Sequence, residues 1–129
     1  MAGVTLIVLG GSRGNPGAGY GSYAVIRGNE RRITRIEFGG TMTNNEAEYD
    51  TLITALRTLL KAGAADDMLD IQSANQVVAK QLRGLWKASD PALRMRYMKA
   101  KDLLGQFKGW KVTRISREQA AHEVASSAR

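Results

Sequence analysis

The stretch from Thr41 to Leu56 (TMTNNEAEYDTLITAL) constrains the fold of this chain most strongly, because it carries both a helix start and a helix face. Thr43 and Glu46 stand three residues apart, as in a capping box, so a helix is expected to begin at about Asn44. Apolar residues then recur at three- and four-residue intervals, which predicts one buried stripe. The stripe comprises Tyr49, Leu52, Ile53, Leu56, Leu59 and Leu60. Gly63 is expected to cap the helix C-terminus.

Glu48 lies at the edge of this apolar stripe, one turn from the positive end of the helix. A carboxylate at the margin of a core is costly, and a purely structural helix face has no need of one. The structural alternative is a solvated glutamate on the shoulder of the helix. Glu48 is therefore a candidate catalytic acid, whose role depends on the segments around it.

Basic residues are concentrated in residues 76–117, where eleven Lys and Arg stand against two Asp, for a local net charge of +9. The rest of the chain carries −2, and the whole chain +7. This asymmetry is typical of a protein that binds a polyanion, although a solvated basic face is the alternative. Cysteine is absent, which excludes disulfides and thiolate metal sites.

The 129 residues are expected to form one domain, residues 1–129, with a sizeable core. The first apolar run, residues 4–9, is far too short to span a bilayer and has no charged region before it. We therefore expect a cytoplasmic protein without a signal peptide or membrane contact, acting as a monomer.

The remaining segments predict alternating strands and helices. The expected strands cover residues 4–9, 19–27, 31–38, 68–71 and 110–115. Besides the central helix, the expected helices cover residues 76–82, a segment starting at Ser89-Asp90-Pro91, and residues 118–127. Residues 10–19 contain five glycines and Pro16, so the chain is expected to reverse there. The order βββαβααβα favours the α/β class, with helices on both faces of a mixed sheet.

Several segments, in this order, resemble the type I ribonuclease H family. They are GGSRGNPG at residues 10–17, TNNEAEY at residues 43–49, QLRGLWK at residues 81–87 and a final Arg117-Glu118. The resemblance covers nearly the whole chain. It implies a ribonuclease H-like fold with a five-stranded sheet in the order 3-2-1-4-5, whose first, fourth and fifth strands are parallel. It also implies cleavage of the RNA strand of RNA–DNA hybrids by two Mg²⁺ or Mn²⁺ ions held by four carboxylates.

Matching these motifs without gaps leaves one of the four carboxylates in place. Glu48 occupies the second position, whereas Leu9, Ala74 and Val124 occupy the other three, and a one-residue gap would shift the last of these. None of these three side chains can donate an electron pair to a cation. Since Mg²⁺ needs more than one carboxylate, we expect no metal cofactor and a catalytically defective site.

Neighbouring acids are not expected to replace the missing ligands. Asp70 stands four residues before Ala74, about 13 Å along an extended strand. Glu123 is turned by about 100° around the helix from the fourth position, and Glu46 lies on another side of its helix from Glu48. His122 is expected to be a surface residue without function.

The family's minor-groove contacts are better matched than its metal ligands. The resemblance assigns this role to Asn15 in the GNPG turn and to Asn44 and Asn45 at the helix start. Neutral amides suit the task because a ribose 2′-hydroxyl both donates and accepts hydrogen bonds. Capping and turn formation are the structural alternatives for these asparagines, and the two roles can coexist.

Four further residues are candidates for contacts with the backbone of a duplex. Arg13 and Thr43 are candidates for phosphate binding, Thr43 through the exposed N-terminus of its helix. Trp86 with Lys87 resembles the family's DNA-strand contact, an aromatic plane beside a cation. The alternative for Trp86 is a core tryptophan.

Three functions remain open on the sequence alone. The first is a nucleic-acid-binding domain that recognises an RNA–DNA hybrid or related duplex without cutting it. The second is an active or weakly active ribonuclease H. The third is a structural or protein-interaction module, as in the connection domains of some retroelement polymerases.

Overall fold

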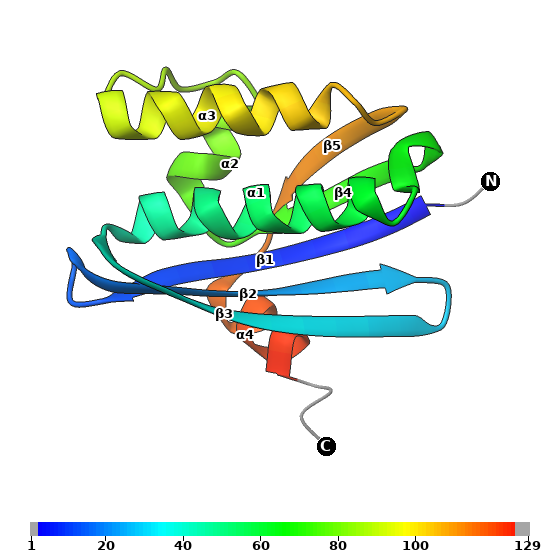
Figure 1. Cartoon of the computed structure of the whole chain (residues 1–129), viewed down its shortest axis with the longest axis horizontal. Coiled ribbons are helices and arrows are strands. Elements are labelled where there is room, and N and C mark those ends of the chain that lie inside the picture. The colour runs from blue at the N-terminus through cyan, green and yellow to red at the C-terminus, as the bar shows by residue number, and fades with distance from the viewer. Residues whose placement is uncertain (1–2, 126–129) are drawn as a thin grey trace.

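The computed structural model describes residues 3–125, which form a five-stranded sheet with helices on both faces (Figure 1). The strands are β1 Gly3–Arg13, β2 Gly17–Arg27, β3 Glu30–Met42, β4 Met68–Ser73 and β5 Gly109–Arg114. The helices are α1 Asn44–Lys61, η1 Ala64–Asp66, α2 Gln76–Leu82, α3 Pro91–Leu104 and α4 Arg117–Ala125.

The sheet order is β3-β2-β1-β4-β5, which confirms the expected ribonuclease H-like architecture. β2 is antiparallel to both β1 and β3, whereas β4 is parallel to both β1 and β5. Helices α1, α2 and α3 lie on one face of the sheet and α4 on the other (Figure 1). None of the helices within residues 3–125 is both long and apolar enough to cross a membrane.

The helix starts expected from the sequence are confirmed. Glu46 N–H donates to Thr43 Oγ1 (3.2 Å) and Thr43 N–H donates to Glu46 Oε1 (2.9 Å), so the capping box is complete. Asp90 caps α3 by accepting from Leu93 N–H (3.0 Å). Gly63 follows the α1 C-cap at a φ of 84°, a conformation that L side chains rarely adopt.

The expected reversal over residues 10–19 is wrong in its extent, because β1 continues to Arg13 and only residues 14–16 form the turn. The glycines at the start of this segment are needed for a close approach of other groups to β1, and not for a turn. A Cβ on Gly10 would lie 2.5 Å from the backbone nitrogen of Glu48, and a Cβ on Gly11 would lie 2.7 Å from the Tyr20 hydroxyl. These glycines therefore allow the helix and a neighbouring side chain to approach the strand.

Other element boundaries differ modestly from the expected ones. β3 runs on to Met42 and β4 to Ser73, because pairing with neighbouring strands extends them beyond their apolar stretches. The short helix η1 was not expected. The last two residues of the expected C-terminal helix, 126 and 127, lie outside the described residues.

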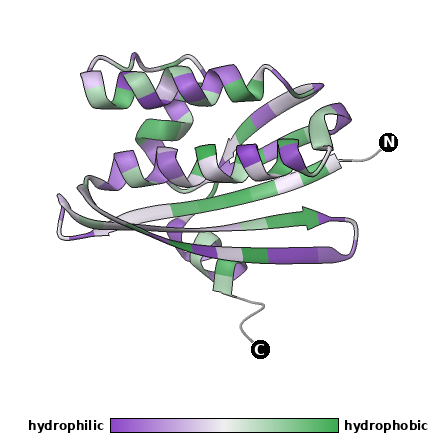
Figure 2. Cartoon of the chain, viewed as in Figure 1, coloured by the Kyte–Doolittle hydropathy of each residue, from purple (hydrophilic) through white to green (hydrophobic). Residues whose placement is uncertain are grey.

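Two hydrophobic clusters fill the two sides of the sheet. The larger one joins the sheet to α1 and α3, with Leu6, Leu52 and Leu104 fully buried. The smaller cluster joins the sheet to α4 and contains Ile7, Ala24, Ala120 and Val124 as its buried members. Figure 2 shows the hydrophobic residues along β1 and the hydrophilic ones near the β3 hairpin. The two clusters fix α1 and α4 on opposite sides of β1, where the candidate site lies.

Candidate functional site

Glu48 is held between α1, β1 and the end of β4. Its Oε1 accepts from Gly10 N–H (2.7 Å) and its Oε2 accepts from Ser73 Oγ–H (2.6 Å). The residue is only 1% exposed, so the alternative of a solvated glutamate on the helix shoulder is wrong. Ser73 Oγ also accepts from Asn75 N–H (3.1 Å), which connects the carboxylate to the start of α2. Glu48 thus ties three elements together through both of its oxygens.

Burial raises the pKa of Glu48 to about 7, against an ordinary value of 4.5. The hydrogen bonds from Ser73 and Gly10 and the positive charge of Arg117 act in the opposite direction but only partly offset the loss of solvation. Glu48 therefore changes its charge near neutral pH.

Leu9, Ala74 and Val124 belong to the smaller hydrophobic cluster, beneath α4. Val124 is buried, and Leu9 and Ala74 are partly buried against the cluster. The three positions that the resemblance assigns to carboxylates are therefore close in space, although they come from β1, the end of β4 and α4. In this chain, all three positions carry apolar side chains that pack in one hydrophobic cluster.

The residues at these positions do not fit a pair of divalent cations. Three of them have no donor atom, and both oxygens of Glu48 already accept hydrogen bonds. Across residues 3–125 there is no group of three His, Cys, Asp or Glu side chains that could hold a metal ion. The donor set thus differs in kind from the four-carboxylate set that the resemblance implies.

The neighbouring acids Asp70 and Glu123 contact other side chains. Asp70 accepts from Thr113 Oγ1 (3.2 Å) and Gln72 Nε2 (3.2 Å) on the sheet. Glu123 pairs with Arg31, which fastens α4 to β3.

Asn15, Asn44 and Asn45 line one hollow at the N-terminus of α1. Asn44 Oδ1 accepts from both Ser12 N–H (2.8 Å) and Ser12 Oγ–H (3.0 Å), and Asn44 N–H donates to Asn15 Oδ1 (3.0 Å). Asn45 Oδ1 accepts from Asn75 Nδ2 (2.8 Å). The hollow is also lined by Thr43, Glu46, Asp90, Ala92 and Leu93. The structure thus groups the three asparagines singled out in the sequence and adds Asn75, which the sequence analysis did not identify.

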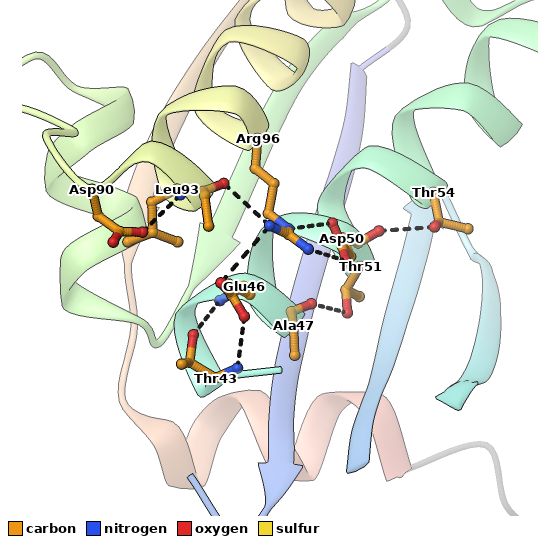
Figure 3. A network of polar contacts seen from close by, with 10 residues as sticks. Thr43, Glu46, Ala47, Asp50, Thr51, Thr54, Asp90, Leu93 and Arg96 are labelled. Carbon is orange, nitrogen blue, oxygen red and sulfur yellow. Dashed lines mark hydrogen bonds and ion pairs between the residues drawn. The ribbon is translucent and has the colours of Figure 1, made fainter. Parts of the chain in front are cut away.

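The N-terminus of α1 is already largely occupied by internal hydrogen bonds. Thr43 and Glu46 cap each other, and Asn44 N–H is used by Asn15. Arg96 of α3 donates to Asp50 of α1 (2.9 Å from Nε to Oδ1) and lies 3.9 Å from Glu46 Oε2 (Figure 3). Arg96 thus holds α3 beside the start of α1.

Arg13 lies where β1 enters the turn, and it is already paired. Its guanidinium donates two hydrogen bonds to Glu37 (2.8 and 2.9 Å) and lies 4.8 Å from the centroid of the Tyr20 ring. The Glu37 carboxylate raises the pKa of Arg13, and Arg13 lowers that of Glu37. Both side chains are largely exposed, so a competing anion has access to the pair.

Trp86 lies in a groove between the α2–α3 connection and α3. It is 43% exposed, so the alternative of a core tryptophan is wrong. Lys80 Nζ lies 4.7 Å from the centroid of its ring, and Lys87 is exposed beside it. The groove is lined by Gly84, Leu85, Trp86, Lys87, Ala88, Arg94, Tyr97 and Met98. Asp90 and Leu93 line the asparagine hollow, and Arg94 lines the groove of Trp86. The first turns of α3 therefore connect the hollow to the groove.

The sheet order and the convergence of β1, α1, β4 and α4 on one region define a ribonuclease H-like domain. Residues 10–128 match the model of the family described as reverse transcriptase-like. The chain belongs to the type I ribonuclease H family.

Two curated relatives share 38% identity with the chain. Ribonuclease HI of Halobacterium salinarum aligns over 111 residues, 84% of this chain and 54% of that protein. The bifunctional protein Rv2228c of Mycobacterium tuberculosis aligns over 101 residues, 77% of this chain and 27% of that protein. The chain thus spans about half or less of the length of these relatives.

Solved structures match over nearly the full chain. The crystal structure of RNase H1 from Halobacterium salinarum has a TM-score of 0.81 at 34% identity, covering 95% of this chain and 92% of that one. The N-terminal RNase H domain of Rv2228c from Mycobacterium tuberculosis has a TM-score of 0.82 at 28% identity, covering 100% of both chains. LC11-RNase H1, solved in complex with an RNA/DNA hybrid, has a TM-score of 0.80 at 25% identity and covers 93% of this chain and 90% of that one.

Proposed function

We propose that this chain binds an RNA–DNA hybrid or a related nucleic-acid duplex without cutting it. The observation that carries the proposal is the apolar cluster formed where four carboxylates would be needed, with Leu9, Ala74 and Val124 at three of the positions. A two-metal reaction requires clustered anions to offset the charge of the cations, and Glu48 alone does not supply them. The asparagine hollow and the Trp86 groove retain surface groups suited to a duplex.

An active ribonuclease H is the second candidate. It is favoured by the 38% identity to a protein named ribonuclease HI and by the presence of Glu48. The third candidate, a structural module of the same fold, predicts no binding of nucleic acid at all. The +9 charge of residues 76–117 favours a polyanion partner over this third candidate.

The test is a labelled RNA–DNA hybrid incubated with the protein and either Mg²⁺ or Mn²⁺. We expect binding by fluorescence anisotropy, with an affinity that falls steeply with added salt because counterions are released, and no cleavage in either metal. Metal-dependent cleavage that disappears in a Glu48→Gln variant would establish the second candidate. Cleavage that is unchanged in that variant indicates a contaminating nuclease. An absence of binding at low salt would favour the structural module.

The pairing of Arg13 with Glu37 leads to a prediction about affinity. Replacing Glu37 by Gln removes the carboxylate that competes with phosphate for the guanidinium. If Arg13 contacts the duplex, the variant should bind the hybrid several-fold more tightly at low salt, and its salt slope should increase by about one. Titrations of the hybrid at several salt concentrations measure both quantities.

Glu30→Gln is the matched control for this prediction. It removes the same charge from the first residue of the same strand. An equal gain in affinity for both variants would show that net charge alone is responsible and that Arg13 has no specific role.

A further inference from the structure

We propose that the three asparagines of the hollow form a surface of hydrogen-bond donors only, which disfavours guanine in the minor groove, and that Asn75 sets the orientation of one of them. This inference rests on the proposed function, since it specifies which duplexes that surface accepts. Asn15, Asn44 and Asn45 are called the amide array below.

The orientation of each amide follows from backbone groups that can only donate. Ser12 N–H requires an oxygen from Asn44, and Asn44 N–H requires an oxygen from Asn15. Both carboxamides therefore direct their oxygen inward, and Ser12 Oγ adds a second donor to the oxygen of Asn44. Their Nδ2 groups remain available to a ligand.

Asn45 is oriented through one intermediate residue. Asn75 caps α2, so its Oδ1 must accept from Val78 N–H (2.9 Å). Its Nδ2 consequently faces Asn45 and fixes Oδ1 of that residue as the acceptor (2.8 Å). Within residues 3–125, no hydrogen bond takes up the Nδ2 group of Asn15, Asn44 or Asn45. Each oxygen of the amide array thus already accepts a hydrogen bond from the protein, and the Nδ2 hydrogens are the groups left for a ligand.

The hollow also selects neutral acceptors over anionic ones. Among residues 3–125, no Lys or Arg lines it, whereas Glu46 and Asp90 do. Glu46 accepts from Thr43 N–H and lies 3.9 Å from Arg96, which offsets part of its charge, and Asp90 accepts from Leu93 N–H. The remaining negative charge disfavours a phosphate there. Base edges and ribose oxygens are the neutral acceptors of a minor groove.

Guanine is the base that conflicts with such a surface. A·T pairs present only the acceptors adenine N3 and thymine O2 in the minor groove, whereas a G·C pair adds the guanine 2-amino donor. A donor that meets a donor leaves both without a partner, and the cost of one such loss corresponds to about tenfold in affinity. A hybrid without minor-groove amino groups should therefore bind more tightly.

The test uses one hybrid sequence in which guanosine is replaced by inosine, which removes only the 2-amino group. We expect the inosine hybrid to bind about tenfold more tightly by fluorescence anisotropy. In the converse experiment, 2,6-diaminopurine in place of adenine adds the amino group, and it should weaken binding. Because the first change destabilises the duplex and the second stabilises it, a preference for more stable duplexes would give the opposite order of affinities.

Asn75→Asp tests the positioning role. Aspartate still caps α2, but it presents an oxygen to Asn45, whose amide must then turn and expose its own oxygen to the ligand. The inosine-to-guanosine affinity ratio should fall clearly. Gln76→Glu, which adds the same charge at the neighbouring exposed position, should keep the ratio unchanged.

The outcomes separate the two proposals. Equal affinities for the guanosine and inosine hybrids, with binding intact, would overturn the donor-surface proposal and leave the proposed function standing. An unchanged ratio in Asn75→Asp would overturn the role of Asn75. If no duplex binds at low salt, both the proposed function and this inference are wrong.

Discussion

A variant carrying Leu9→Asp, Ala74→Asp and Val124→Asp is expected to unfold at a much lower temperature than the wild-type protein in EDTA. Truncating Leu9 and Val124 removes contacts from the cluster beneath α4, a loss on the order of 2–4 kcal/mol. Three new carboxylates beside Glu48 add burial of charge and mutual repulsion. Millimolar Mg²⁺ or Mn²⁺ should restore much of the loss, because a cation that binds only the folded state stabilises it. Thermal unfolding in EDTA and in each metal measures both effects.

The same variant should also cleave an RNA–DNA hybrid, if the rest of the scaffold is suited to the reaction. The matched control carries Asn at positions 9, 74 and 124, which gives side chains of the same size without charge. It should be destabilised but recover little stability with metal. A clear rise in wild-type melting temperature with Mg²⁺ would contradict the proposal, since only a native-state site produces it. An absence of metal rescue in the aspartate variant would show that the three positions do not form a metal site.

The sequence predicted the helices well because their signals are local. The capping box of Thr43 and Glu46, the Asp90-Pro91 start and the glycine after α1 each act within a few residues. The glycines at the end of β1 were misinterpreted for the opposite reason. Gly10 is needed because the backbone of Glu48, 38 residues later, lies against it. A glycine that makes room for a distant helix looks, in one sequence, like a glycine that makes a turn.

The candidate site was predictable in its positions but only partly in its chemistry. Counting along the family motifs identified Leu9, Ala74 and Val124, which the fold brings into one cluster. The hydrogen bond from Ser73 to Glu48 and that from Asn75 to Asn45 join residues 25 and 30 positions apart. Such pairs depend on how β4 ends beside α1, which no local pattern specifies.

The free energy of unfolding of the wild-type protein is expected to fall as the pH rises from about 4.5 to about 7. In this window the folded state keeps a proton on Glu48, whose pKa is raised to about 7, whereas the unfolded state has lost it at its ordinary value of 4.5. The stabilisation that the protonated Glu48 gives the folded state is fully present below pH 4.5 and is lost as the pH passes through 7. It amounts to roughly 3 kcal/mol in the free energy of unfolding.

Glu48→Gln should remove this pH dependence. The Gln Oε1 can still accept from Gly10 N–H, and its Nε2 can donate to Ser73 Oγ, so the contacts are kept while the charge change is lost. Urea unfolding of both proteins at pH 5, 6, 7 and 8 gives the difference in their free energy of unfolding at each pH, in which contributions common to both proteins cancel. The wild type should lose stability relative to the variant between pH 5 and 8. A difference that stays constant would mean that Glu48 is ionised throughout, and that its two hydrogen bonds and Arg117 outweigh its burial.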